Sequence, residues 1–296
     1  MKLKLFSSLV FIVCSVIIQA QVSITDDGSS ADPSAMLEIK STTKGLLLPR
    51  MSQAERDGIA SPVAGLVVWC TNCGVNGQVQ VYNGSFWTNL TGGTADITCG
   101  SDFTDLRNGI TYGTVLIGTQ CWMAENLNIG TMVGVSSNQA NNGVIEKYCY
   151  GNITTNCDVY GGLYQWNEMM QYSTNEGVRG ICPDGWHLPT DGELTLLVTY
   201  LGGEGAAGGA MKETGLAYWS SPNTGATNSS GFTGLPGGYA VPPSSSNINT
   251  IGYFWTSTQF DGSNGYYRNL NYNNTAASRN PSNKAFGFSV RCVKNN

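Results

Sequence analysis

His187 is the first residue to consider for catalysis or metal binding, because it is the single histidine of the chain. It lies in the segment GICPDGWHLPT at Gly180–Thr190. A catalytic histidine needs a nucleophile to deprotonate or a carboxylate to orient it. Asp184 and Asp191 are near in sequence but suggest no triad, and no Gly-x-Ser-x-Gly motif is present. A metal site would normally bring further histidines. We therefore expect His187 to support the fold, and we assign no catalytic residue, no metal site and no cofactor.

The residues after His187 predict a helix that would position it. Thr190 and Glu193 have the spacing of a capping box, and leucines then recur on one helical face up to a stop at Gly202. His187 lies three residues before the helix cap at Thr190, in a turn that Pro183 and Pro189 restrict on both sides.

Cysteine usage indicates an oxidised protein. The chain has nine cysteines, and Cys14 lies in an N-terminal leader, which leaves an even number with 105 conceivable pairings. The close spacing of Cys70 with Cys73 and of Cys149 with Cys157 favours two local disulfides. Zinc or redox chemistry at the CTNC motif is disfavoured, because no second such motif and no thioredoxin-like pattern accompany it. The eight cysteines expected in disulfides are Cys70, Cys73, Cys99, Cys121, Cys149, Cys157, Cys182 and Cys292.

Residues 1–20 have the features of a secretory signal peptide. Lys2 and Lys4 precede an apolar run over residues 9–18, and Ala20 offers a small residue for cleavage. The run is short for a membrane span, and nothing after it resembles one. We expect a protein that is secreted or held at the outer cell surface.

Lipidation and nucleic-acid binding are both disfavoured. Val13 precedes Cys14 at the position where lipid attachment prefers a small residue. The net charge of −5 becomes more negative once the two leader lysines are removed, and no basic block is present. We therefore expect the partner to be a glycan or a protein on an extracellular surface.

Composition favours a strand- and loop-rich fold. Only 12% of residues are charged, whereas 38 are glycine and 41% are hydrophobic, enough to build a core. The length of 296 residues allows two domains. Short strand-like stretches, with a capping box at Ser52 and Glu55 and a turn at Asn83–Gly84, predict a small β-rich module over residues 21–92. A linker at residues 93–97 would follow it.

The first module resembles a segment of exported Bacteroidetes and phage-tail-fibre-like proteins. The resemblance rests on DPSAMLEIKSTTKGLLLPRMSQAERDGIASPVAGLVVW followed by VYNGSFWTNL. It implies a small β-rich stalk or collar, with assembly into a homotrimer through this module.

The remainder, residues 98–294, resembles the Fibrobacter succinogenes major paralogous domain. The matching strings, in order, include TVLIGTQCWMAENLN, YGGLYQWNE, GICPDGWHLPTDGELTLLVTYLGG, YFWTSTQ and AFGFSVRCV. The resemblance implies an α+β, C-type-lectin-like fold with a long irregular excursion over residues 203–285. It also implies a Cys182–Cys292 disulfide, which leaves Cys99 and Cys121 as the remaining pair.

The sequence lacks the residues that two related families use for their activities. Formylglycine-generating enzymes act through a cysteine pair in the C-terminal half of the domain, whereas Cys292 is the only cysteine after Cys182. The calcium-dependent sugar motifs of animal lectins are also missing, and Ser221–Asn223 lacks the carboxylate that calcium prefers. We expect no enzyme.

Aromatic residues of the excursion are the candidate ligand-binding residues. Rings set among small polar residues are typical of recognition surfaces, and ring faces can stack on sugars. The alternative is that alternate members, such as Tyr253 and Trp255, fill the core. The candidates are Trp255, Tyr266, Tyr267, Arg268 and Tyr272.

Three functions remain open. The first is a non-catalytic binding or adhesion protein that recognises glycan or protein through the loop region of the lectin-like domain. The second is a structural or fibre-tip component that makes assembly contacts only. The third, and weakest, is an oxidase similar to the formylglycine-generating enzymes.

Overall fold

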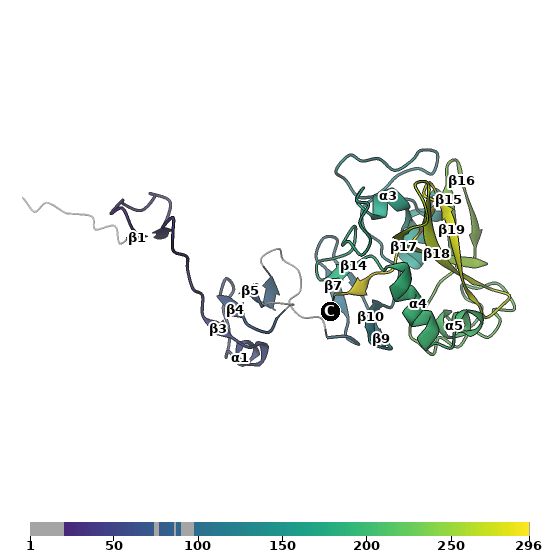
Figure 1. Ribbon diagram of the computed structural model, residues 1–296, viewed down its shortest axis with the longest axis horizontal. Helices are drawn as coiled ribbons and strands as arrows, with labels where there is room; N and C mark the ends of the chain where they lie inside the picture. The colour runs from purple at the N-terminus through teal and green to yellow at the C-terminus, as the bar shows by residue number, and fades with distance from the viewer. Residues whose placement is uncertain (1–20, 74–76, 86, 90–97, 296) are drawn as a thin grey trace, which may run out of the picture. The chain divides into compact units, whose positions relative to one another are not determined.

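The structure is a computed structural model that describes residues 21–73, 77–85, 87–89 and 98–295 (Figure 1). The expected signal peptide at 1–20, Cys14 and the expected linker at 93–97 lie outside these ranges. The chain divides into two compact units, Met1–Pro49 and Arg50–Asn296. Strands dominate and helices are short, so the expectation of a β-rich chain with some helix is confirmed. Within the described part of the chain, no helix combines the length and apolar character that crossing a bilayer requires.

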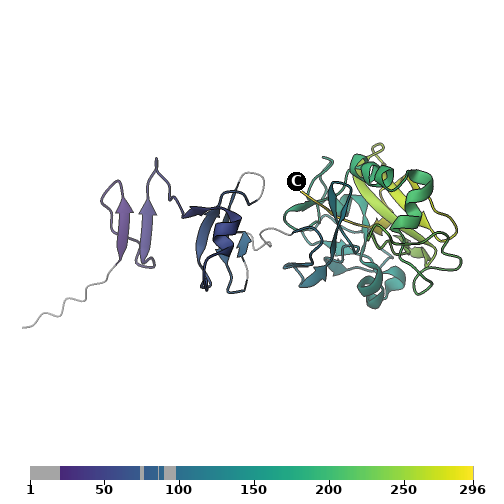
Figure 2. The same cartoon turned by 90° about the horizontal axis from the view of Figure 1, so that it is seen from below.

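The first unit is a pair of parallel strands, β1 (Val22–Thr25) and β2 (Leu37–Lys40), seen side by side in Figure 2. Its apolar side chains are mostly exposed: 72% for Met36 and 80% for Leu47. Two strands without a covering layer are marginal in water. This unit therefore presents apolar surface that nothing within the unit covers.

The described residues between 50 and 89 include a small four-stranded sheet, in the order β3-β4-β5-β6, with one helix. The predicted capping box is confirmed, since the Ser52 side chain accepts from the Glu55 amide and Glu55 reaches back to the Ser52 amide. Val68 and Trp87 form the core beside the Cys70–Cys73 disulfide. The elements are β3 (Arg50–Met51), α1 (Gln53–Asp57), β4 (Val67–Cys70), β5 (Gln78–Tyr82) and β6 (Trp87–Asn89).

The larger domain, residues 98–295, is built on two main sheets. A four-stranded sheet has the order β14-β21-β10-β9, so strands from both ends of the domain are neighbours. A seven-stranded sheet has the order β13-β20-β15-β17-β18-β19, and β16 pairs with β15. The strands of the two sheets are β9 (Thr114–Ile117), β10 (Gln120–Met123), β13 (Leu163–Gln165), β14 (Trp186–His187), β15 (Gly237–Val241), β16 (Ser244–Ile248), β17 (Ile251–Gln259), β18 (Asn264–Asn271), β19 (Ala277–Asn283), β20 (Gly287–Ser289) and β21 (Val293–Lys294).

Short strand pairs and helices complete this domain. The helices α4 and α5 pack on one face of the seven-stranded sheet (Figure 1). The remaining elements are β7 (Phe103–Asp105), β8 (Ile110–Tyr112), β11 (Thr131–Met132), β12 (Glu146–Lys147), η1 (Tyr150–Asn152), α2 (Thr154–Tyr160), α3 (Trp166–Met169), α4 (Asp191–Tyr200) and α5 (Glu204–Met211).

The expectation of an irregular excursion over residues 203–285 is wrong for most of that range. It contains α5 and the long strands β17 and β18, which pair from Ile251 opposite Asn271 to Gln259 opposite Gly265, with one register shift. Their sequences, IGYFWTSTQ and NGYYRNLN, contain the aromatic and β-branched residues that suit strands. The longest stretch without a regular helix or strand in this range covers about residues 213–236, and the rest of the irregular backbone is short turns between strands.

Alternate side chains of β17 face two cores on opposite sides of the sheet. Phe254 belongs to the core that includes α4 and α5, together with Trp122 and Phe232. Trp255 belongs to the other core, with Trp166. Burying large rings on both faces fixes the register of this strand, since a shift by one residue would exchange the two sets.

A buried lysine holds the irregular segment that follows α5. Lys212 Nζ donates to the carbonyl oxygens of Thr224, Asn271 and Asn274, each at 2.9 Å. Three acceptors satisfy the three protons of an ammonium group. Burial lowers the pKa of Lys212 to about 8. Hydrogen bonds from the Lys212 side chain thus satisfy backbone carbonyls of this segment, as hydrogen bonds between strands do in the sheets.

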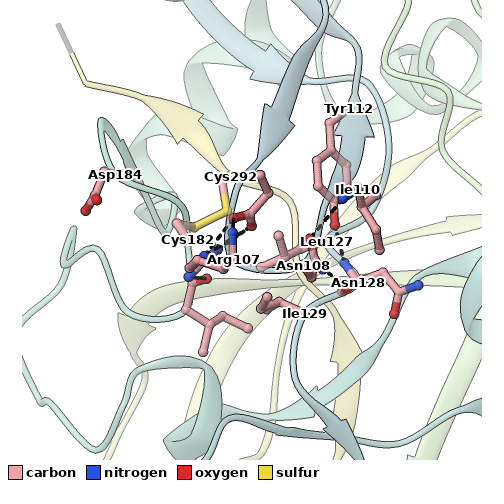
Figure 3. A network of polar contacts seen from close by, with 12 residues as sticks. Arg107, Asn108, Ile110, Tyr112, Leu127, Asn128, Ile129, Cys182, Asp184 and Cys292 are labelled. Carbon is pink, nitrogen blue, oxygen red and sulfur yellow. Dashed lines mark hydrogen bonds and ion pairs between the residues drawn. A yellow bond between two sulfur atoms is a disulfide. The ribbon is translucent and has the colours of Figure 1, made fainter. Parts of the chain in front are cut away.

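All four expected disulfides are confirmed: Cys70–Cys73, Cys99–Cys121, Cys149–Cys157 and Cys182–Cys292. Figure 3 shows the Cys182–Cys292 bond beside the side chain of Arg107. Arg107 donates to the Ile181 carbonyl at 2.9 Å and pairs with the buried Asp105 carboxylate at 2.7 Å. The β7–β8 pair is thereby attached to the segment that enters β14.

Candidate binding surface

His187 is part of a structural clamp at the start of α4. Its Nε2 lies 2.8 Å from Glu193 Oε1, and its Nδ1 lies 2.7 Å from Asn295 Oδ1. The Glu193 carboxylate also accepts from the backbone amide of Thr190, completing the predicted capping box. Both ring nitrogens are therefore engaged in joining the helix entry to the C-terminal segment.

The His187 clamp predicts a pH-dependent stability. Burial lowers the pKa of His187, but the bonds to Glu193 and Asn295 outweigh it and the net shift is upward. A raised pKa adds stability that is fully present below the unfolded value of about 6.5 and is lost as the pH rises through the folded value. Thermal melts from pH 6 to 9 should show a loss of at most about 1 kcal/mol.

His187→Gln keeps a polar side chain but cannot titrate, so its melts should lack this pH-dependent loss. An identical pH profile in the wild type and the variant would contradict the role given to the clamp. The Glu193 contribution has the opposite sign, because its pKa is lowered in the folded state. It is lost only as the pH falls through that value.

The structure separates the five candidate binding residues. Tyr266 and Tyr267 are adjacent in β18, so their side chains lie on opposite faces of the sheet. Tyr267 lies on the Trp255 face, whereas Tyr266 and Arg268 lie on the face of the α4 and α5 helices. Tyr272 follows β18 and packs against the helix-side core. These residues cannot form one contact surface.

Two of the candidates are core residues in the structure. Trp255 is 1% exposed, and its Nε1 donates to the Tyr164 carbonyl at 3.0 Å. Arg268 is 2% exposed, and its guanidinium donates to Thr195 Oγ1 at 2.8 Å. The alternative that alternate members fill the core therefore holds for Trp255. Neither side chain is available to a surface ligand.

Half-buried rings gather on the Trp255 side of the seven-stranded sheet. Tyr253 stacks on buried Phe288 with ring centroids 4.8 Å apart and lies 5.7 Å from Tyr267. Tyr239 lies 5.8 Å from Tyr253 and 5.2 Å from Phe286. We call Tyr239, Tyr253, Tyr267 and Phe286 the aromatic face. Because its rings rest on a packed core, they are held in place before any ligand arrives.

Asparagine amides accompany the aromatic face. Asn247 Nδ2 donates to the Tyr253 hydroxyl at 2.8 Å. Asn269 pairs with Tyr253 across the strands, and Asn280 pairs with Tyr267. Burial raises the pKa values of Tyr253 and Tyr267, so both hydroxyls stay protonated as donors. The face thus offers ring surfaces together with neutral hydrogen-bonding groups.

The helix side of the same strands is committed to internal contacts. The Arg279 guanidinium lies 3.7 Å from the centre of the Tyr266 ring, and its Nε lies 2.9 Å from Asp191 Oδ2. Tyr266 also contacts Phe260 edge-on, at 5.4 Å. These contacts attach β18 and β19 to the start of α4.

Sequence reasoning missed a polar pocket in this domain. It encloses about 390 Å³ and is lined by residues from separate loops, including Asn138, Glu168 and Lys284. Gln165, Asn167 and Glu168 of the string YQWNE supply part of its wall, but nothing in their spacing indicates a pocket. Across the described residues, no three side chains of His, Cys, Asp or Glu gather closely enough to hold a metal ion.

Comparisons with known proteins match two successive segments of the chain. The family model of the Fibrobacter succinogenes major domain matches residues 115–294, more than half of the chain. A model described as a phage tail like trimerisation region matches residues 25–105. Searches of curated proteins and of solved structures found no significant match. The chain therefore belongs to the Fibrobacter succinogenes major domain family.

Proposed function

We propose that this chain is an exported, non-catalytic binding protein that recognises glycan or protein through the aromatic face. The observation that carries the proposal is the row of half-buried rings Tyr239, Tyr253 and Tyr267, of which Tyr253 and Tyr267 contact the buried ring of Phe288. Tyrosine supplies large contact area at low entropic cost, and its ring faces suit the C–H groups of a sugar. The neighbouring amides add directional bonds.

The scaffold that carries this face is proposed to be C-type-lectin-like. Pairing of β10 with β21 brings the two ends of the domain together, and the Cys182–Cys292 bond reinforces the junction. All eight cysteines outside the leader are in disulfides. That usage supports a structural role for Cys292 and counts against the oxidase alternative.

The N-terminal region is proposed to assemble the protein into a homotrimer. Val22, Ile24 and Leu37 are each more than half exposed in an otherwise uncovered strand pair. The match to a phage tail like trimerisation region points to two further copies of the chain as the cover. The result would be a short stalk that presents three binding domains at a surface, with export through residues 1–20.

Glycan and protein arrays, probed with the mature chain, test the recognition proposal. We expect reproducible binding to one class of surface molecule. Silence on both arrays would contradict recognition and favour the fibre-tip alternative. Light scattering on the same material should give three times the monomer mass, and a monomer would contradict the stalk.

A further inference from the structure

The polar pocket is formed where four separated segments meet. Its wall combines the loop before β12, the β13–α3 junction, the β17–β18 turn and the β19–β20 turn. Its volume of about 390 Å³ lies in the usual range for small-molecule sites, about 300–1,000 Å³. The lining residues are Asn138, Gln139, Gln165, Asn167, Glu168, Tyr172, Gly262, Ser263, Asn283, Lys284 and Ala285.

The buried side chains of Gln139 and Gln165, here called the floor of the pocket, are held by hydrogen bonds. Gln165 is buried, and its Nε2 donates to Asn138 Oδ1 at 2.8 Å and to the Ala285 carbonyl at 2.7 Å. Gln165 Oε1 accepts from the Gln139 backbone amide at 2.9 Å. A satisfied buried network specifies one arrangement of its members. The floor is therefore in place before a ligand enters.

The charged side chains in the pocket lining are Glu168 and Lys284, so their formal charges sum to zero. Glu168 is 1% exposed, and its carboxylate accepts from the Glu146 amide at 2.9 Å and from the Tyr172 hydroxyl at 3.0 Å. Lys284 Nζ lies 4.3 Å from the centre of the Trp166 ring. The lining therefore carries one charge of each sign and no net charge, which favours a ligand without net charge.

Several polar groups of the pocket keep unused hydrogen-bonding capacity. Lys284 Nζ donates to Gln259 Oε1 at 2.6 Å and to the Gly262 carbonyl at 3.2 Å, which leaves one of its three protons. Among the described residues, the Asn167 side-chain amide and the Ser263 hydroxyl have no hydrogen-bond partner. The pocket therefore offers both donors and acceptors to a ligand.

We propose that this pocket binds one neutral sugar residue, a hexose or an N-acetylhexosamine. Vicinal hydroxyls each donate and accept, which matches amides, a hydroxyl and an ammonium proton around a polar floor. This inference rests on the proposed recognition function and narrows its ligand to glycan. It adds a subsite that uses none of the aromatic-face residues.

Titration calorimetry of the mature chain with free methyl glycosides tests the pocket. The panel contains neutral hexosides, N-acetylhexosaminides, a glucuronide and a glucosaminide. We expect binding of a neutral member, with affinity reduced at least about tenfold in the Asn167→Ala, Ser263→Ala double variant. Both side chains lack internal bonds, so the melting temperature should stay unchanged. The control is Ser229→Ala, Asn273→Ala, which changes residues outside the pocket lining and should bind as the wild type does.

Three results would overturn the inference: no glycoside binding, preference for a charged glycoside, or equal binding by the double variant and wild type. If the arrays show glycan or protein binding while these results are obtained, the pocket assignment fails and the recognition proposal stands. If the arrays are also silent, both fail together.

Discussion

Replacing Cys182 and Cys292 by serine is expected to lower the free energy of unfolding by about 4–5 kcal/mol. The two residues are 110 positions apart, so their bond closes a long loop and removes much conformational entropy from the unfolded chain. Both side chains are fully buried. Urea denaturation of the double variant and the wild type, under non-reducing conditions, measures the difference.

The Cys149–Cys157 pair provides a matched control for this prediction. Its separation is only 8 residues, and the same loop-closure argument gives a loss of about 2–3 kcal/mol for its double serine variant. The ordering of the two losses is the informative result. A smaller loss for the Cys182, Cys292 variant would contradict the view that this bond is the main covalent restraint of the domain.

Replacing Tyr267 by alanine is expected to weaken ligand binding by at least about 30-fold, equivalent to about 2 kcal/mol. Tyr267 lies next to Tyr253 and contacts the buried ring of Phe288, so it is a ring held in place at one end of the aromatic face. Rigid aromatic anchors of this kind dominate binding energies. Tyr267→Phe keeps the ring and should lose less than about tenfold. Both affinities are measured by titration against the strongest array ligand.

Local patterns of the sequence were sufficient for several features of the fold. Both capping boxes follow from a spacing of three residues, because a side chain and a backbone amide exchange bonds within one turn. The two short disulfides follow from proximity along the chain. The Cys182–Cys292 bond has no local signal and could be expected only through the family resemblance.

The candidate site was predicted less well, because it depends on which face each strand residue occupies. Composition drew attention to Tyr266 and Tyr267 together, but adjacent strand residues point in opposite directions. Once residues 264–271 are known to be a strand, Tyr267 joins Trp255 and Tyr266 joins Arg268. The aromatic face could then be read from the pairing of β17 with β18.

Contacts between residues far apart in the chain could not be predicted from one sequence alone. The polar pocket joins loops that are up to about 150 residues apart, and no spacing rule connects Asn138 with Lys284. Lys212 likewise gives no local sign of burial, because lysine is usually exposed and its three carbonyl partners come from distant turns.

The most direct test of the central claim compares Tyr267→Ala with Tyr266→Ala in binding to the same ligand. The two tyrosines are neighbours in β18 with similar partial exposure, but only Tyr267 belongs to the aromatic face. We predict that Tyr267→Ala loses at least about 30-fold in affinity. Tyr266→Ala removes internal contacts with Arg279 and Phe260 but no ring of the aromatic face, so it should stay within about threefold of wild type at a temperature where both variants are folded. Wild-type affinity in Tyr267→Ala, or the larger loss in Tyr266→Ala, would contradict recognition through this face.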